Sequence, residues 1–371
     1  MQPQKSDRMK VNIKNKTVAA LIFVIGAAAV ICGGLYIWDQ VMRTKDARHL
    51  QDCGYQYAMG SADYSLSYQK IGNDAAKHIV VTIAGIGADD FTEALHPLTA
   101  CLQTNTLAVC IDRAGYGLSN DTHIPQTIDR AAADYRAVLK NAGIEPPYIL
   151  MPHAYGAVIA AYWESQYPDE IEGIFFLDGD VPNDEAVQAQ YAPLTAWTQR
   201  LCSVFGLTRL IPDMVQTLPP DYSPVQRENA EMLSLHSFRT FAKDSEEKLL
   251  AENYKTAYEN LVTTDIPKVY LNAGVFRSAE EWLAADDWAR TFRKMPEQSD
   301  TERQKAAEQA VAENKQNAEA VIKPYTEQLG NCEYIEISGD PYIYMHKPAA
   351  CAVLFSRFLS RIEDDGTETG S

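Results

Sequence analysis

Short apolar runs that alternate with helical segments constrain the fold of this chain more than any other feature. The runs HIVVTIAG, TLAVCID, YILMP, IEGIFFLDGD, IPKVYLNAG and CEYIEISG follow one another between residues 78 and 339. Mainly apolar runs of this length are typical of strands buried on both faces of a parallel sheet. Helical patterns separate most of them, so the sequence predicts an α/β fold with a mostly parallel, doubly wound sheet. Residues 63–72, DYSLSYQKIG, alternate in polarity and are expected to form an exposed edge strand.

A predicted helical insertion interrupts this alternation late in the sheet. From Val181 to about Asp265 the sequence favours several helices joined by Pro-rich segments such as LPPDYSP. An insertion at this place is expected to cover a cleft. We therefore predict a core made of residues 60–181 and 266–362, with a helical cap at 182–265.

A further helix is predicted between the last two apolar runs. Ser299-x-x-Glu302 has the form of a capping box, and helix-forming residues continue through Val321. Pro324 is expected to end this helix. The helix is polar on all sides, so we expect a solvated excursion rather than a binding element. EDDGTETGS at 363–371 is expected to be a disordered tail.

One stretch near the N-terminus has the length and composition of a membrane span. Residues 17–38, TVAALIFVIGAAAVICGGLYIW, carry no charge and are long enough to cross the ~30 Å hydrocarbon core as a helix. They lack the short apolar region and Ala-x-Ala-like exit of a cleaved signal peptide, so we predict an uncleaved signal anchor, with a cleaved signal as the alternative. Basic residues are more frequent in the preceding tail, 1–16, than in the following juxtamembrane linker, 39–59. This bias predicts a single-pass cell-membrane protein with a cytoplasmic N-terminus and an extracytoplasmic C-terminal domain.

Charge and cysteine content exclude some classes of partner. The formal net charge is −17 although the first fifty residues are basic, so the exported part is strongly acidic and nucleic-acid binding is not expected. The seven cysteines form no CxxC pair and no Cys/His cluster at zinc spacing, so we expect neither a metal site nor a cofactor. Their pairing into disulfides stays open.

The segment ILMPHAYGAVIAAYWESQYPDE, residues 149–170, carries the main functional signal. An apolar strand ends near Met151, the sharp turn PHAYG follows at 152–156, and an Ala-rich helix begins after it. Strand, tight turn and helix is the layout on which a nucleophilic serine is mounted in one large class of hydrolases. Here the residue at the apex is Ala154, which has no nucleophilic atom.

Four blocks in sequence order resemble those of α/β-hydrolases of the esterase/peptidase-like superfamily that have a helical cap. The first block, IAGIG at 83–87, resembles the HGxG oxyanion loop, with Ala84 where histidine is usual. The second, DRAGYGLS at 112–119, resembles DRPGYGxS. The third is PHAYG with the following YPDEI at 167–171, which resembles the elbow and its YPDEV turn, and the fourth, PYIYMHKP at 341–348, resembles the terminal HYIHxDxP. The resemblance covers residues ~60–362 and implies the α/β-hydrolase fold.

The same resemblance implies that the catalytic triad is degenerate. In these enzymes a serine attacks, a histidine takes its proton, and a carboxylate orients the histidine. The matching blocks place Ala154 in the serine position and Pro341 in the histidine position. His346 is a possible substitute base, and Asp178 and Asp180 are candidates for the acid. Loss at two positions favours natural decay over an engineered Ser→Ala change.

Main-chain groups of such a site do not depend on the lost side chains. The resemblance implies oxyanion-type N–H donors from Tyr155 and Ile86, with Gly85 allowing close approach. His153 is expected to pack and hydrogen-bond near the elbow. The Tyr155 hydroxyl could be a replacement nucleophile, but it is expected to form a pocket wall because its pKa is near 10.

These observations predict a catalytically inactive, membrane-anchored pseudo-hydrolase. We expect it to bind a small carbonyl- or carboxylate-containing ligand, a peptide, or a protein partner that the sequence does not identify. The alternative is an active ester or peptide hydrolase with a rewired triad built on His346. An interaction scaffold that uses the acidic surface and the 299–323 helix is the third hypothesis.

Overall fold

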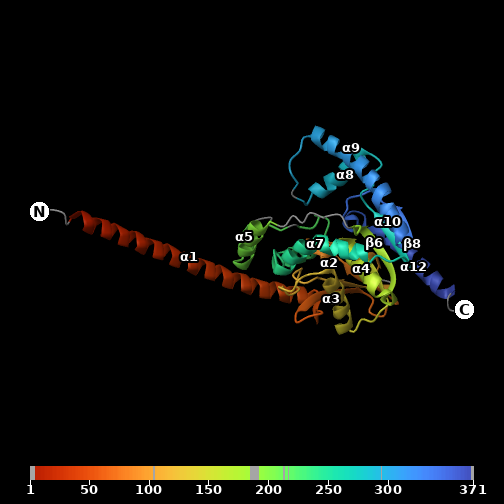
Figure 1. Ribbon diagram of the computed structural model, residues 1–371, viewed down its shortest axis with the longest axis horizontal. Coiled ribbons are helices and arrows are strands. Elements are labelled where there is room, and N and C mark those ends of the chain that lie inside the picture. The colour runs from red at the N-terminus through yellow and green to blue at the C-terminus, as the bar shows by residue number, and fades with distance from the viewer. Residues whose placement is uncertain are drawn as a thin grey trace.

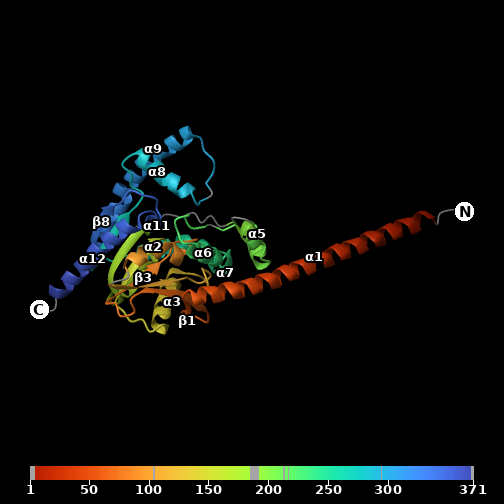
Figure 2. The ribbon, with the colours of Figure 1, turned by 180° about the vertical axis from the view of Figure 1, so that it is seen from behind.

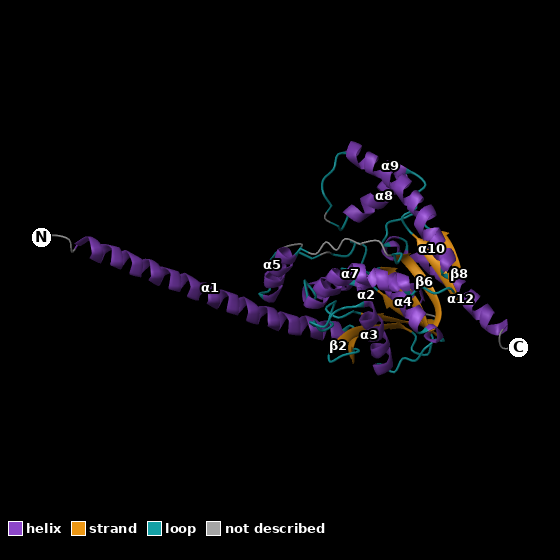
Figure 3. Cartoon of the chain, viewed as in Figure 1, coloured by secondary structure: helices purple, strands orange, loops and turns teal. Residues whose placement is uncertain are grey.

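The computed structural model describes residues 5–102, 105–183, 192–211, 214–215, 217–293 and 295–368. Its centre is an eight-stranded sheet in the order β1-β2-β4-β3-β5-β6-β7-β8. β1 pairs antiparallel with β2, and β2 pairs antiparallel with β4, whereas all the other pairs are parallel. The sheet, orange in Figure 3, is therefore mostly parallel, as the sequence predicts. The strands are β1 (Tyr55–Met59), β2 (Ser65–Gly72), β3 (His78–Ile83), β4 (Thr106–Ile111), β5 (Tyr148–Ala154), β6 (Ile171–Gly179), β7 (Thr264–Asn272) and β8 (Gly330–Glu336).

Helices cover both faces of the sheet and divide the core into two apolar layers. The central strand β5 shows how, because Ile149 and Met151 point into one layer while Tyr148 and Leu150 point into the other. Helices α3 (Ile128–Asn141) and α4 (Gly156–Gln166) cover the Tyr148 face, and α2 (Phe91–Leu102) and α12 (Pro348–Glu368) cover the opposite face. Burial on both faces explains why these strands are apolar throughout.

The first helix, α1 (Lys5–Asp52), extends far beyond the rest of the protein (Figures 1 and 2). Within the residues that the structure describes, it is the one helix long and apolar enough to cross a membrane. The juxtamembrane segment 39–59, for which the sequence allows a helix or a linker up to about Asp52, forms the end of α1 and the edge strand β1. Tyr55 and Ala58 explain the strand, because both are buried against the core.

Helices occupy the segment predicted as the cap, between β6 and β7. They are α5 (Pro193–Val204), the 3₁₀ turn η2 (Leu207–Leu210), α6 (Pro224–His236) and α7 (Phe241–Glu259). Residues 184–191, 212–213 and 216 of the predicted cap lie outside the described residues.

A second helical excursion separates β7 from β8 and lies on the opposite side of the molecule from α3 (Figure 1). It contains α8 (Ala279–Arg290), α9 (Asp300–Asn317), the π turn η3 (Ala318–Ile322) and α10 (Lys323–Gln328). The capping box of Ser299 and Glu302 is present. Pro324 does not end the helical path: it stands in the first turn of α10, where the N–H that proline lacks is not needed.

The C-terminal elements also differ in part from expectation. The turn after β8 leads into the short helix α11 (Ile343–His346), and α12 then continues to Glu368. The segment 363–371, predicted as a disordered tail, therefore begins as helix, because nothing in its first residues stops the preceding helix. Residues 369–371 lie outside the described part of the chain.

Candidate functional site

The turn between β5 and α4 has the strained geometry of a nucleophile elbow. Ala154 has φ +47°, which few residues other than glycine adopt. A Cβ atom on Gly156 would lie 2.1 Å from the carbonyl oxygen of Ile83, and one on Gly85 would lie 3.0 Å from Cβ of Ala154. The two glycines therefore permit a close approach of β3, β5 and α4 at the point where a serine would stand.

The predicted oxyanion donors flank this point. Tyr155 is the N-cap residue of α4, and Ile86 follows Gly85 in the loop after β3. Among the described residues, no acceptor is hydrogen-bonded to the N–H of Ile86 or Tyr155. The carbonyl of Ala154 accepts a hydrogen bond from the N–H of Asp180 (3.0 Å), which fixes the elbow to the end of β6. Both donors can thus bind an oxygen atom of a ligand.

A buried arginine holds the loop after β3 in place. Arg113 donates to the carbonyl oxygens of Ala84 (2.5 Å) and Gly85 (3.1 Å). The other edge of its guanidinium binds the Glu246 carboxylate of α7 at 2.8 and 3.2 Å, and both side chains are only 5% exposed. Burial alone would lower the pKa of Arg113, but the charge of Glu246 holds it well above its usual range. The cap and the oxyanion loop are thereby joined by one ion pair.

A tyrosine extends this network to the tip of the loop. Tyr116 donates to Glu246 (2.5 Å) and accepts from the N–H of Gly87 (3.3 Å). The sequence identifies the block DRAGYGLS, which contains Arg113 and Tyr116, but does not reveal these roles. The partner Glu246 lies far along the chain in the cap, and no motif marks it.

His153 lies in an aromatic cluster beside the elbow. Its ring centroid is 6.1 Å from that of Phe91, 5.3 Å from Tyr342 and 4.9 Å from Tyr344. Burial lowers the pKa of His153 to about 4, opposed by hydrogen bonding to the Pro341 main chain. The imidazole is therefore neutral at pH 7, and its buried Nδ1 has no hydrogen-bond partner among the described residues.

The candidate base His346 has other partners. Its Nδ1 accepts a hydrogen bond from the N–H of Asp340 (3.1 Å), and its ring stacks on Trp288 of α8 at 4.6 Å and 18°. Pro341, which the sequence resemblance matches to the usual histidine, is exposed in the turn between β8 and α11. Within the described part of the chain, the contacts of His346 lie in the corner formed by α8 and this turn.

The two candidate acids stabilise turns. Asp178 has φ +54° and accepts a hydrogen bond from the N–H of Ala273 (2.8 Å), which ties β6 to β7. Burial, reinforced by Asp180 and Asp340, raises the pKa of Asp178 to about 7. Asp180 accepts from the Tyr254 hydroxyl (2.5 Å). Neither carboxylate is hydrogen-bonded to a histidine in the residues that the structure describes.

The Tyr155 hydroxyl is placed as part of a wall and not as a nucleophile. It accepts a hydrogen bond from the Asn253 side chain (2.8 Å), and its ring stacks on Tyr254 at 5.7 Å. Burial raises the pKa of Tyr155 further above its usual value, so the phenolate form is not populated at neutral pH.

An arginine that the sequence did not single out lies near Pro341. The Arg293 guanidinium lies 4.1 Å from the centre of the Tyr342 ring and binds both carboxylate oxygens of Asp340 at 3.0 Å. Its Nε is buried and has no partner among the described residues. Arg293, Asp340 and Pro341 line a cavity of about 190 Å³ under α8 and α9. This corner thus contains an arginine–aspartate ion pair with one free donor on the arginine.

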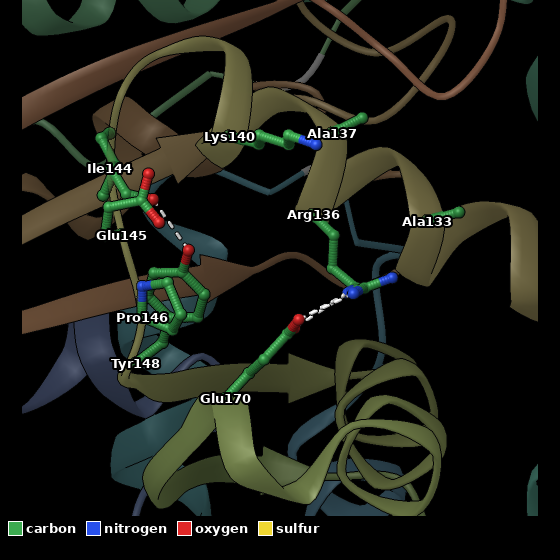
Figure 4. Close-up of a pocket in the computed structure, with 9 residues that line it drawn as sticks. All are labelled: Ala133, Arg136, Ala137, Lys140, Ile144, Glu145, Pro146, Tyr148 and Glu170. Carbon is green, nitrogen blue, oxygen red and sulfur yellow. Dashed lines mark hydrogen bonds and ion pairs between the residues drawn. The ribbon is translucent and has the colours of Figure 1, made fainter.

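A larger hollow of about 390 Å³ lies under α3, at the other end of the sheet (Figure 4). Its walls include the ion pair of Arg136 and Glu170 (2.7 Å), and Tyr148, which donates to the carbonyl of Ile144 (2.8 Å). Tyr148 begins β5 and Ala154 ends it, so this hollow is roughly 20 Å from the elbow. It is separate from the candidate site. In the described part of the chain, no three His, Cys, Asp or Glu side chains are grouped as metal ligands would be.

Comparisons with known proteins agree with this geometry at the level of fold. No family model matches the chain. Protein YbdG of Bacillus subtilis, which is uncharacterised, is 27% identical over 256 residues, covering 66% of this chain and 75% of YbdG. An AB hydrolase superfamily protein of Gibberella zeae is 31% identical over 75 residues, but these cover 19% of this chain and 23% of that protein.

Solved structures align over most of the chain. Epoxide hydrolase CorEH aligns with a TM-score of 0.54 at 15% identity, covering 83% of this chain and 99% of CorEH. Haloalkane dehalogenase DbeA from Bradyrhizobium elkani aligns with a TM-score of 0.52 at 14% identity, covering 84% and 99%. The chain therefore has the α/β-hydrolase fold that its sequence blocks predict. At sequence identities this low, the likeness shows a common fold and not a common activity.

Proposed function

We propose that this protein is a membrane-anchored pseudo-hydrolase that binds a small carboxylate- or carbonyl-containing ligand without turning it over. One observation carries the proposal: the elbow keeps a strained φ of +47° at Ala154, a residue with no nucleophilic atom. Backbone strain of this kind persists where the surroundings impose it, commonly at functional sites. The same turn presents the N–H group of Tyr155, to which no acceptor in the described residues is hydrogen-bonded and which can bind an oxygen.

The side chains around the elbow favour binding over hydrolysis. Serine-type hydrolysis needs an attacking oxygen, a base within hydrogen-bond reach and an orienting acid. Ala154 and Pro341 supply neither of the first two, and His346 is engaged by Asp340 and Trp288. Asp178 is engaged by Ala273. An enzyme of this class without its triad retains only a residual ~10³–10⁴-fold advantage over water.

The free donors near the elbow favour a carboxylate over a neutral carbonyl. The Arg293 guanidinium lies over the Tyr342 ring, and its Nε donor has no partner in the described residues, although Asp340 already offsets its charge. Neutral His153 adds an Nδ1 atom beside Gly85. A carboxylate would gain hydrogen bonds from main-chain N–H groups and from the free edge of Arg293 together.

Thermal unfolding of the full chain in detergent micelles tests ligand binding. Short- and medium-chain carboxylates should raise the unfolding temperature, and the matching neutral amides should raise it less, because binding to the folded state stabilises it. Arg293→Gln should abolish the difference between carboxylate and amide. Arg290→Gln is the matched control, because Arg290 ends α8 three residues before Arg293 and also pairs with an aspartate, Asp286. If no carboxylate or ester stabilises the protein, the binding proposal is wrong.

A fluorophosphonate probe and p-nitrophenyl esters separate this proposal from an active hydrolase with a rewired triad. We expect no covalent labelling and no ester turnover above a heat-killed sample, because no attacking atom stands at Ala154. Stoichiometric labelling would instead support the hydrolase, and the labelled residue would identify its nucleophile.

A further inference from the structure

An apolar face is exposed on the first cap helix and the turn after it. Leu194, Trp197, Leu201 and Val204 of α5 recur at helical spacing, and Leu194 and Trp197 are 75% and 58% exposed. Leu210, the last residue of η2, and Ile211 after it are also exposed and extend this face. We call these six residues the α5 face. A contiguous exposed patch of large apolar side chains marks an interaction surface more often than a simple soluble surface.

The structure fixes the α5 face at one particular level of α1. Arg209 of η2 binds Asp39 and Asp46 of α1, each at 2.7 Å, and Asp39 is almost completely buried. A Cβ atom on Gly206, between α5 and η2, would lie 2.6 Å from Cβ of Asp39. Arg43 of α1 also donates to the Ser203 hydroxyl of α5 (3.3 Å). Both views show α5 beside α1, set apart from the sheet (Figures 1 and 2).

Asp39 is the first charged residue after the apolar stretch 17–38. A helix rises ~1.5 Å per residue, so this stretch spans ~30 Å, the thickness of the hydrocarbon core. If α1 crosses the bilayer, Asp39 lies where the hydrocarbon core meets the headgroups. The α5 face is attached at this same level, immediately after Tyr36 and Trp38 in α1, which are exposed aromatic residues of the kind found in interfacial belts.

We propose that the α5 face lies in the interface of the membrane that α1 enters, so that the cap contacts lipid directly. An amphipathic helix with Trp and Leu on one side is suited to this position. Its opposite side supports the assignment, because Ala196 and Ser203 are buried within the protein. The contact rests on the membrane-anchored part of the proposed function, but it is independent of the ligand. The cap then has two attachments to the bilayer, one through α1 and one through α5.

Quenching of tryptophan fluorescence by brominated lipid tests this contact. The full chain, reconstituted in phosphatidylcholine vesicles with dibrominated acyl chains, contains five tryptophans. Trp197→Phe should remove about half of the quenched signal, because Trp197 and Trp38 are the two tryptophans placed at the interface. Trp38→Phe should remove a comparable share. Trp282→Phe is the control: its tryptophan lies on α8, so the quenched signal should not decrease.

Each other outcome overturns the contact in a recognisable way. If Trp197→Phe behaves like Trp282→Phe while Trp38→Phe removes quenched signal, α1 is in the bilayer but the α5 face is not. If Trp38→Phe also removes none, the membrane anchor fails together with the contact. A second copy of the chain would be the occupant if Trp197 is not quenched and Leu194→Ser with Leu201→Ser converts a dimer into a monomer in detergent.

Discussion

Two regions at the same edge of the sheet are held in different ways. At the elbow, between β3 and β5, the main chain is strained at Ala154 and closely packed at Gly156. At the ends of β7 and β8, side chains make the contacts: Arg293 pairs with Asp340, and His346 stacks on Trp288 of α8. The elbow is fixed by close main-chain packing, which does not depend on the side chain at 154. Under the proposed function, catalytic side chains can therefore be absent while the backbone around them keeps its geometry.

The largest loss of stability is expected when the buried ion pair of Arg113 and Glu246, which holds the loop beside the elbow, is broken. Arg113→Met leaves the carboxylate of Glu246 buried without its partner, and we expect the free energy of unfolding to fall by ~3–5 kcal/mol. Urea unfolding in detergent measures this loss. The double variant with Glu246→Met should be more stable than the single variant, because no charge then stays buried unpaired.

An exposed pair in the same helix as Glu246 provides the control. Lys255 and Glu259 are 3.6 Å apart and both mostly exposed, so Lys255→Met should change stability by less than ~1 kcal/mol. Similar losses for Arg113→Met and Lys255→Met would show that the buried pair does not hold the loop.

The pH dependence of stability should distinguish His153 from the carboxylates of the same edge. The pKa of folded His153 is about 4, and an unfolded histidine titrates near 6.5. Between these values the unfolded chain binds the extra proton, so stability falls as pH falls. From pH 7.5 to pH 5 the loss due to His153 should be ~2 kcal/mol, and His153→Phe should lack it. Chemical unfolding of both proteins at the two pH values gives the difference.

The carboxyl group of Asp178 changes stability with pH in the opposite direction, but it is present in both wild type and His153→Phe. Its pKa of about 7 is above the unfolded value, so its contribution is full at low pH and is lost as pH rises toward 7. The difference between wild type and His153→Phe therefore isolates the histidine. An equal pH dependence in the two proteins would mean that His153 is not buried in its neutral form.

Because the backbone at Ala154 is strained, replacing this residue by glycine should stabilise the protein. Ala154→Gly relieves the unfavourable positive φ, so we expect unfolding free energy to rise by ~0.5–1 kcal/mol. Ala160→Gly, a change of the same atoms within α4, should lower it by about 1 kcal/mol or more. Thermal unfolding of the two variants side by side provides the measurement. If both lose stability equally, the turn is not strained.

The sequence predicted the elements that depend on local patterns and missed those that depend on distant partners. The parallel strands follow from continuous apolar runs, and the close approaches at Gly85 and Gly156 follow from short motifs. The pairing of Arg113 with Glu246 could not be predicted, because the two are 133 residues apart and neither spacing nor composition links them. Pro324 shows a different limit: the helical path changes from a π turn to α10 just before it, so this proline stands in a first turn, where its missing N–H is not needed.

The smallest effect, on ester hydrolysis, is expected for His346→Gln in the corner at the ends of β7 and β8. This residue is the base that a rewired triad would need, yet its Nδ1 is occupied by the N–H of Asp340 and its ring by Trp288. A general base has to reach the proton it removes, directly or through one water. We therefore expect wild type and His346→Gln to hydrolyse p-nitrophenyl acetate equally, both at the rate of a heat-killed sample. A glutamine can accept the same hydrogen bond, so the fold around β8 should persist. If the wild type instead hydrolyses the ester faster than the heat-killed sample, and His346→Gln loses this activity at an unchanged unfolding temperature, the β7–β8 corner carries chemistry and the difference between the two regions disappears.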